Sequence, residues 1–82
     1  MAGKLRSLGG RDVLRALRRF GFEVAAIRGS HVKLQRVVVT GETQTLTIPL
    51  DKALARGTVR AIFRQPCRHI PEADLRPWFF TD

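Results

Sequence analysis

Apolar residues recur at helical spacing in two stretches of the chain. The first predicts an amphipathic helix over residues 10–20, with Gly9 as its N-cap, Gly21 at its end and an apolar stripe of Val13, Leu14, Leu17 and Phe20. The second predicts a helix that opens at Gly57-Thr58, with a stripe of Val59, Ile62 and Phe63. Pro66 ends this helix, because it disfavours helical geometry at the preceding residue.

Between the two helices the apolar positions alternate, which predicts three strands. Gly29-Ser30 and Thr40-Gly41-Glu42-Thr43 supply the turns, and Pro49 is expected at the end or the open edge of the third strand. We expect even-numbered residues to face the core: Phe22, Val24, Ala26, Val32, Leu34, Val38, Leu46, Ile48 and Leu50. The odd-numbered residues then face the other side: His31, Lys33, Gln35, Thr45 and Thr47. Arg36 breaks this alternation, and a bulge is expected at Arg36–Val39.

The order of elements predicts an α+β fold. Helix, strand, strand, strand, helix gives a three-stranded antiparallel sheet with both helices on one face, over residues 1–66. Residues 67–82 form a separate tail, in which a short helix over residues 70–75 ends near Arg76-Pro77. The aromatic end, Trp78-Phe79-Phe80, is expected to fold back onto the core rather than form an exposed partner-binding patch.

Charge narrows the choice of partner. The 82 residues suffice for one domain with a thin core, and 15 Lys and Arg against 7 Asp and Glu give a net charge of +8. Most of the basic residues are Arg, whose guanidinium group forms bidentate hydrogen bonds with phosphate oxygens. Nucleic acid is therefore the favoured partner, ahead of an acidic protein or a merely solvated basic surface.

Several classes of protein are disfavoured. No apolar run approaches the roughly 20 residues of a membrane helix, and no signal-peptide core follows Met1, so we expect a cytoplasmic protein without membrane association. A single cysteine, Cys67, excludes an internal disulfide, and it is a poor candidate nucleophile. With only His31 and His69 as histidines, we expect neither a metal site nor a cofactor.

His31 is the candidate for chemistry. It follows the Gly29-Ser30 turn and shares a strand face with Lys33, in a strongly basic chain. An imidazole in positive potential is suited to acid–base chemistry on a polyanion. The competing interpretation is that His31 is a polar residue on the solvated side of a strand.

Four segments in register resemble a known family. They are Leu17-Arg18-Arg19-Phe20-Gly21-Phe22, Gly29-Ser30-His31, Leu46-Thr47-Ile48-Pro49-Leu50 and Gly57-Thr58-Val59-Arg60-Ala61-Ile62, and together they resemble the HicA (YcfA-like) mRNA interferase toxins over residues 5–66. The resemblance implies an αβββα fold similar to the double-stranded-RNA-binding domain, mRNA cleavage and neutralisation by a HicB-type antitoxin. It implies that His31 is catalytic, with Gly29 and Ser30 as its turn. Asp51 and Val32 stand where many members have further histidines, and the tail lies outside the resemblance.

The residues agree with the chemistry that this resemblance implies. A histidine, with an ordinary pKa of about 6.5, can take the proton from an RNA 2′-hydroxyl without any metal. Lys33 and Arg28 are the first candidates to stabilise the transition state, Ser30 shapes the turn or contacts phosphate, and Gly29 provides backbone freedom. The alternatives are a non-catalytic RNA-binding module of the same fold and a protein whose main role is complex formation. A toxin of this charge is expected to pair with an acidic antitoxin that covers His31.

Overall fold

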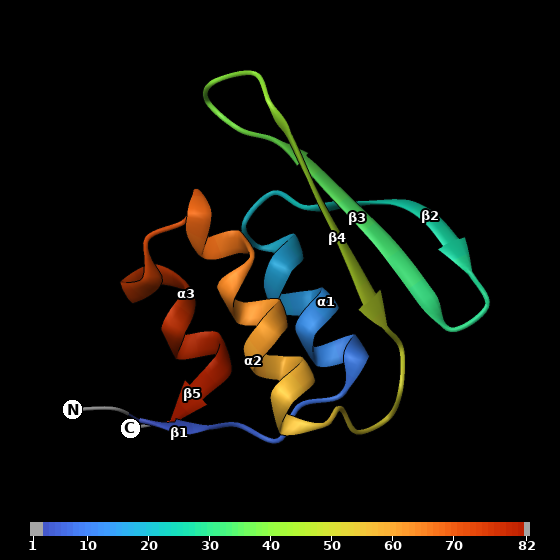
Figure 1. Cartoon of the computed structure of the whole chain (residues 1–82), viewed down its shortest axis with the longest axis vertical. Helices are drawn as coiled ribbons and strands as arrows, with labels where there is room; N and C mark the ends of the chain where they lie inside the picture. The colour runs from blue at the N-terminus through green and yellow to red at the C-terminus, as the bar shows by residue number, and fades with distance from the viewer. Residues whose placement is uncertain (1–2, 82) are drawn as a thin grey trace.

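The computed structural model describes residues 3–81. Its main elements are helix α1 (Gly10–Arg18), strands β2 (Glu23–Arg28), β3 (His31–Val37) and β4 (Thr43–Pro49), and helix α2 (Arg56–Arg64) (Figure 1). The strands form an antiparallel sheet in the order β2-β3-β4. The predicted α+β class and the order of its elements are confirmed. No helix in the described range is both long enough and apolar enough to cross a membrane.

Helices α1 and α2 pack on one face of the sheet. Buried side chains from both layers form one cluster, which includes Val13 and Leu17 of α1, Val32, Leu34, Leu46 and Ile48 of the strands, and Val59, Ile62 and Phe63 of α2. On the other face, His31, Lys33, Thr45 and Thr47 are exposed, as the alternation predicts. One face of the sheet therefore builds the core, and the other is exposed to solvent; we call the second one the free face.

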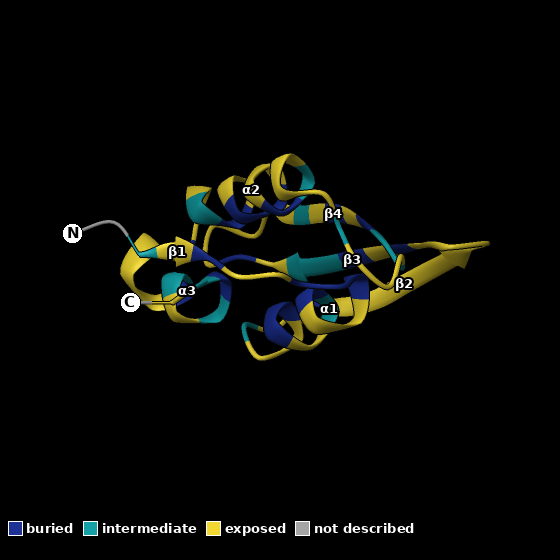
Figure 2. Ribbon diagram, turned by 90° about the horizontal axis from the view of Figure 1, so that it is seen from below, coloured by how far each residue is buried: buried dark blue, intermediate teal, exposed yellow. Residues whose placement is uncertain are grey.

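Strand β2 departs from the prediction. Val24 and Ala26 were expected in the core, but every residue of β2 is exposed, and β2 projects beyond the helices (Figure 2). The register with β3 shifts between Val24 and Ala26, so Ala26 pairs with Lys33 and joins the free face. Val24 pairs with buried Leu34, yet it remains 41% exposed because an edge strand that extends past the helices has no layer to cover it.

The bulge predicted at Arg36–Val39 is not found there; the register shift of this sheet lies in β2, between Val24 and Ala26. The pairs Arg36–Gln44 and Val37–Thr43 keep β3 and β4 in register. Arg36 occupies a core-side position without breaking the strand, because its guanidinium lies at the core margin: Nη1 donates to the Phe20 carbonyl at 2.8 Å, and the group stands 5.3 Å from the Phe22 ring centroid. A long arginine side chain can thus occupy a core-side position at the end of a strand, because its charged group reaches the margin of the core.

The segment after α2 packs against both helices. It contains a 3₁₀ turn η1 (Pro66–Arg68), helix α3 (Glu72–Phe79) and strand β5 (Phe80–Thr81), which pairs with β1 (Lys4–Leu5) near the other end of the chain. The predicted end of this helix near Arg76-Pro77 is wrong, since α3 continues through Pro77 to Phe79. Burial of Phe79, which is fully enclosed and packs on Phe63 at 5.3 Å between ring centroids, accounts for the extension. The aromatic end therefore folds back on the core.

Candidate functional site

His31 is the first residue of β3, and its backbone is fixed by the turn before it. Gly29 has a φ of 55°, in the left-handed region that favours glycine, and this permits the two-residue turn from β2 to β3. The Ser30 carbonyl accepts a hydrogen bond from the Leu50 amide at 2.6 Å, which ties the turn to the chain beyond β4. His31 itself lies between Arg28 and Pro49 on the neighbouring strands.

The start of α1 fixes the same region from the core side. Gly10 donates its amide hydrogen to the Asp51 carbonyl at 2.9 Å, and a Cβ on Gly10 would lie 2.0 Å from the Pro49 carbonyl oxygen. The close approach therefore requires glycine at this position. The segment from Pro49 to Asp51 is held by α1 on one side and by the Ser30 turn on the other, so the backbone under His31 is rigidly supported.

A shallow hollow of about 390 Å³ surrounds His31 on the free face of the sheet; it is lined by Ala26, Arg28, His31, Lys33 and Thr47, and we call it the His31 hollow. Strand register explains the set, because Arg28 pairs with His31, and Lys33 pairs with both Ala26 and Thr47. The structure therefore brings Arg28, His31 and Lys33 together, while Gly29 and Ser30 form the adjacent turn without lining the hollow. Ala26 and Thr47 are additions to the predicted set. The alternation of β4 pointed to Thr47, whereas Ala26 reaches this face only through the register shift.

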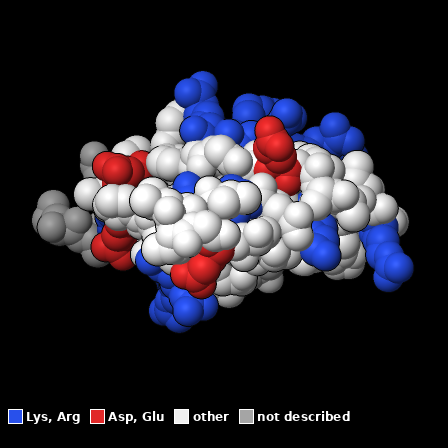
Figure 3. All heavy atoms as spheres, turned by 90° about the horizontal axis from the view of Figure 1, so that it is seen from above, with Lys and Arg blue, Asp and Glu red and all other residues white. Residues whose placement is uncertain are grey.

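The His31 hollow is positively charged. Two of its five lining residues, Arg28 and Lys33, are basic, and none is acidic. Among residues 3–81 the one ion pair within 4 Å joins Arg15 to Asp12, so neither Arg28 nor Lys33 is neutralised by a described carboxylate. The chain as a whole carries a net charge of +8. Figure 3 shows one face of it, on which basic side chains project from several sides and acidic ones form separate patches between them. Such a surface attracts polyanions.

Metal-ligating side chains and the cysteine are the other groups of this chain that could carry chemistry. Within the described residues no group of three or more His, Cys, Asp or Glu side chains is arranged to hold a metal ion. Burial, together with the nearby Glu72 carboxylate, raises the pKa of the Cys67 thiol. A thiol that stays protonated is a poor nucleophile.

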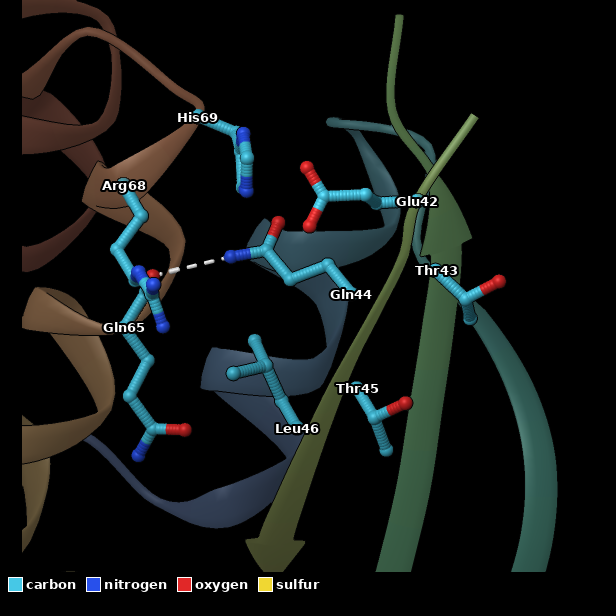
Figure 4. Close-up of a pocket in the computed structure, with 8 residues that line it drawn as sticks. All are labelled: Glu42, Thr43, Gln44, Thr45, Leu46, Gln65, Arg68 and His69. Atoms are coloured by element: carbon cyan, nitrogen blue, oxygen red, sulfur yellow. Dashed lines mark hydrogen bonds between the residues drawn. The ribbon is translucent and has the colours of Figure 1, made fainter. Parts of the chain in front are cut away.

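His69 lies in a different place. It lines a second hollow, of about 210 Å³, between the start of β4 and the segment after α2, together with Glu42, Gln44 and Arg68 (Figure 4). Gln44 spans this gap, since its Nε2 donates to the Gln65 carbonyl at 3.0 Å. His31 pairs with Pro49 at the opposite end of β4, so His69 does not supply a second imidazole to the His31 hollow.

The comparison against protein families covers most of the chain. Residues 10–65 match the family model described as HicA toxin of bacterial toxin-antitoxin. This chain belongs to the HicA toxin family, on the toxin side of a toxin–antitoxin system, and the family implies an antitoxin partner. No curated protein and no solved structure matches the chain. The matched range contains α1, the whole three-stranded sheet, α2 and every residue that lines the His31 hollow.

Proposed function

We propose that this protein is a metal-independent endoribonuclease toxin that cleaves mRNA in the cytoplasm, with His31 as its single catalytic histidine. The observation that carries the proposal is the exposed imidazole of His31 between two unneutralised cations, in a hollow that no carboxylate lines. Membership of the HicA toxin family supports it independently. A non-catalytic RNA-binding module would use the same basic face without turnover, and the cleavage assays below separate the two.

The proposed reaction uses groups that the His31 hollow contains. His31 takes the proton of an RNA 2′-hydroxyl, the 2′-oxygen attacks the adjacent phosphorus, and the bond from phosphorus to the 5′-oxygen breaks. The departing 5′-oxygen takes up a proton from water, His31 releases its proton to the solvent, and the upstream product carries a 2′,3′-cyclic phosphate. Arg28 and Lys33 stabilise the negative charge that develops on the phosphoryl oxygens. The Gly29-Ser30 turn positions the imidazole, and Thr47 adds a hydroxyl-bearing side chain to the lining of the hollow.

Cleavage is expected to persist in EDTA, because the proposed reaction needs a base and cations but no metal-bound water. The measurement is the cleavage rate of a labelled mRNA fragment in excess EDTA, compared with the rate in magnesium. A residual effect of magnesium through RNA folding is controlled with a short unstructured oligonucleotide. Activity that disappears in EDTA and returns with magnesium would contradict the 2′-hydroxyl route.

Binding of RNA is expected to weaken steeply with salt, because each neutralised phosphate releases counterions. Lys33→Ala or Arg28→Ala should each flatten the slope of log affinity against log salt by about 0.7 for a single strand. The measurement is a salt series of dissociation constants with His31→Ala as the background, so that the RNA stays intact. If both variants had the same slope as the parent, we would conclude that neither Arg28 nor Lys33 contacts an RNA phosphate.

The antitoxin is proposed to be an acidic HicB-type protein that covers the His31 hollow. Charge reversal by Arg28→Glu should slow the association of the antitoxin and leave more of the toxin unbound, since complementary charge mainly raises the association rate. Arg60→Glu is the matched control, because Arg60 is an exposed arginine of α2 on the helix side of the sheet. If co-expression with the neighbouring gene recovered no acidic partner, the antitoxin assignment would fail while the nuclease assignment stood.

A further inference from the structure

A second basic hollow lies away from the His31 hollow, where α1 meets both ends of the described chain. It measures about 310 Å³, and it is lined chiefly by Arg6, Asp12, Arg15, Arg19 and Trp78; we call it the Trp78 hollow. Arg6 and Trp78 fall outside the range that matches the HicA family model. The hollow is therefore built partly by segments that the family comparison does not describe.

Each of its three arginines makes a different contact with a neighbouring residue. The Arg19 guanidinium lies over the Trp78 ring at 4.6 Å from the centroid. Arg6 donates its backbone amide hydrogen to the Phe79 carbonyl at 2.8 Å, and its Nη1 lies 3.5 Å from the Trp78 carbonyl oxygen. Arg15 lies 3.9 Å from Asp12. A guanidinium group positioned beforehand, as that of Arg19 is over the Trp78 ring, loses less conformational freedom when it binds an anion.

The lining of the Trp78 hollow has more positive than negative side chains. Asp12 is the one carboxylate among the lining residues, and it is already occupied, since its Oδ2 accepts the Gly9 amide hydrogen at 2.9 Å and caps α1. Three guanidinium groups against this carboxylate leave a charge of about +2. A phosphate monoester carries about −1.5 to −2 at neutral pH and presents three acceptor oxygens. A carboxylate or an internal phosphodiester of RNA carries only one negative charge.

We propose that the Trp78 hollow binds a phosphate monoester, the 5′-terminal phosphate of an RNA strand. Arg6, Arg15 and Arg19 supply the donors, and Trp78 holds Arg19 in position for the contact. The assignment to an RNA end rests on the proposed nuclease function, whereas the monoester chemistry rests on the hollow alone. The site would anchor RNA by its end and leave the strand free to reach His31.

Trp78 is the only tryptophan of the chain, so its fluorescence reports this hollow directly. The experiment titrates the His31→Ala protein with one short RNA carrying either a 5′-phosphate or a 5′-hydroxyl, and separately with inorganic phosphate and with a nucleoside 5′-monophosphate. We expect a saturable change in Trp78 emission and about tenfold tighter binding of the 5′-phosphorylated RNA, the scale of one charge-assisted contact. Inorganic phosphate and the mononucleotide should give the same spectral change at higher concentration.

Arg6→Ala should remove the preference for the 5′-phosphate, while Arg60→Ala, at an exposed arginine outside the hollow, should weaken both RNAs equally and keep it. Equal binding of the two RNAs by the parent protein would overturn the proposal. A change in Trp78 emission produced by poly-glutamate but not by the phosphates would also overturn it, in favour of an acidic protein partner. RNA cleavage by the wild-type protein is measured separately. If the His31→Ala parent shows no preference for the 5′-phosphate while the wild-type protein still cleaves RNA, only this second site is rejected and the nuclease function stands.

Discussion

His31→Ala is expected to lower the rate of RNA cleavage by about 100-fold or more, the typical contribution of a general base. The fold should be unchanged, because the imidazole is exposed on the face of the sheet that builds no part of the core. RNA binding should also stay within a few-fold of the parent, since Arg28 and Lys33 remain. The measurement pairs single-turnover cleavage with a dissociation constant and a thermal melt of the same preparation.

His69→Ala is the matched control for this substitution. It removes the other histidine of the chain, which lies in the separate hollow at the far end of β4. We expect its cleavage rate to match that of the parent. Undiminished cleavage by His31→Ala would exclude His31 as the base, and equal losses in the two variants would indicate a structural effect rather than a catalytic one.

Phe79→Ala should produce the largest loss of stability, about 3–5 kcal/mol, as is typical for truncating a buried aromatic side chain. Phe79 is fully buried, and Phe63, which it contacts, also packs on Phe80 at 5.1 Å between ring centroids. For a domain of this size, the loss is a large share of the total free energy of unfolding. The measurement is urea unfolding followed by circular dichroism.

Val39→Ala provides the comparison, because Val39 is fully exposed and its truncation should change stability by less than about 0.5 kcal/mol. If Phe79→Ala were no more destabilising than Val39→Ala, the end of α3 would contribute little to the core. The aromatic end of the chain would then be available to a partner, as an exposed patch would be.

The alternation of the sequence was sufficient to predict much of the candidate site. In β3 and β4 a strict period of two places His31, Lys33 and Thr47 on one face, and the structure has them there. The period was not sufficient for β2, where Ala26 changed faces at the register shift and Val24 stayed exposed at the edge. A register shift depends on pairing with the next strand, so it leaves no signature in the strand's own sequence.

The two ends of the chain were harder to predict for a related reason. Pro77 is a local signal for the end of a helix, but burial of Phe79 outweighs the lost hydrogen bond, and α3 continues. The pairing of Lys4–Leu5 with Phe80–Thr81 joins residues from opposite ends of the sequence and has no local pattern at all. The Trp78 hollow depends on that pairing, which is why charge counting along the sequence did not find it.

The chemical structure of the cleaved RNA ends tests the central claim most directly. Attack by a 2′-oxygen, with His31 as the base, leaves a 2′,3′-cyclic phosphate on the upstream fragment and a 5′-hydroxyl on the downstream fragment. Mass spectrometry of a short RNA cleaved in EDTA is expected to show these two ends, and a 2′-deoxy substitution at the cleaved nucleotide should abolish cleavage there. Fragments with a 3′-hydroxyl and a 5′-phosphate, or continued cleavage at the 2′-deoxy position, would contradict the mechanism.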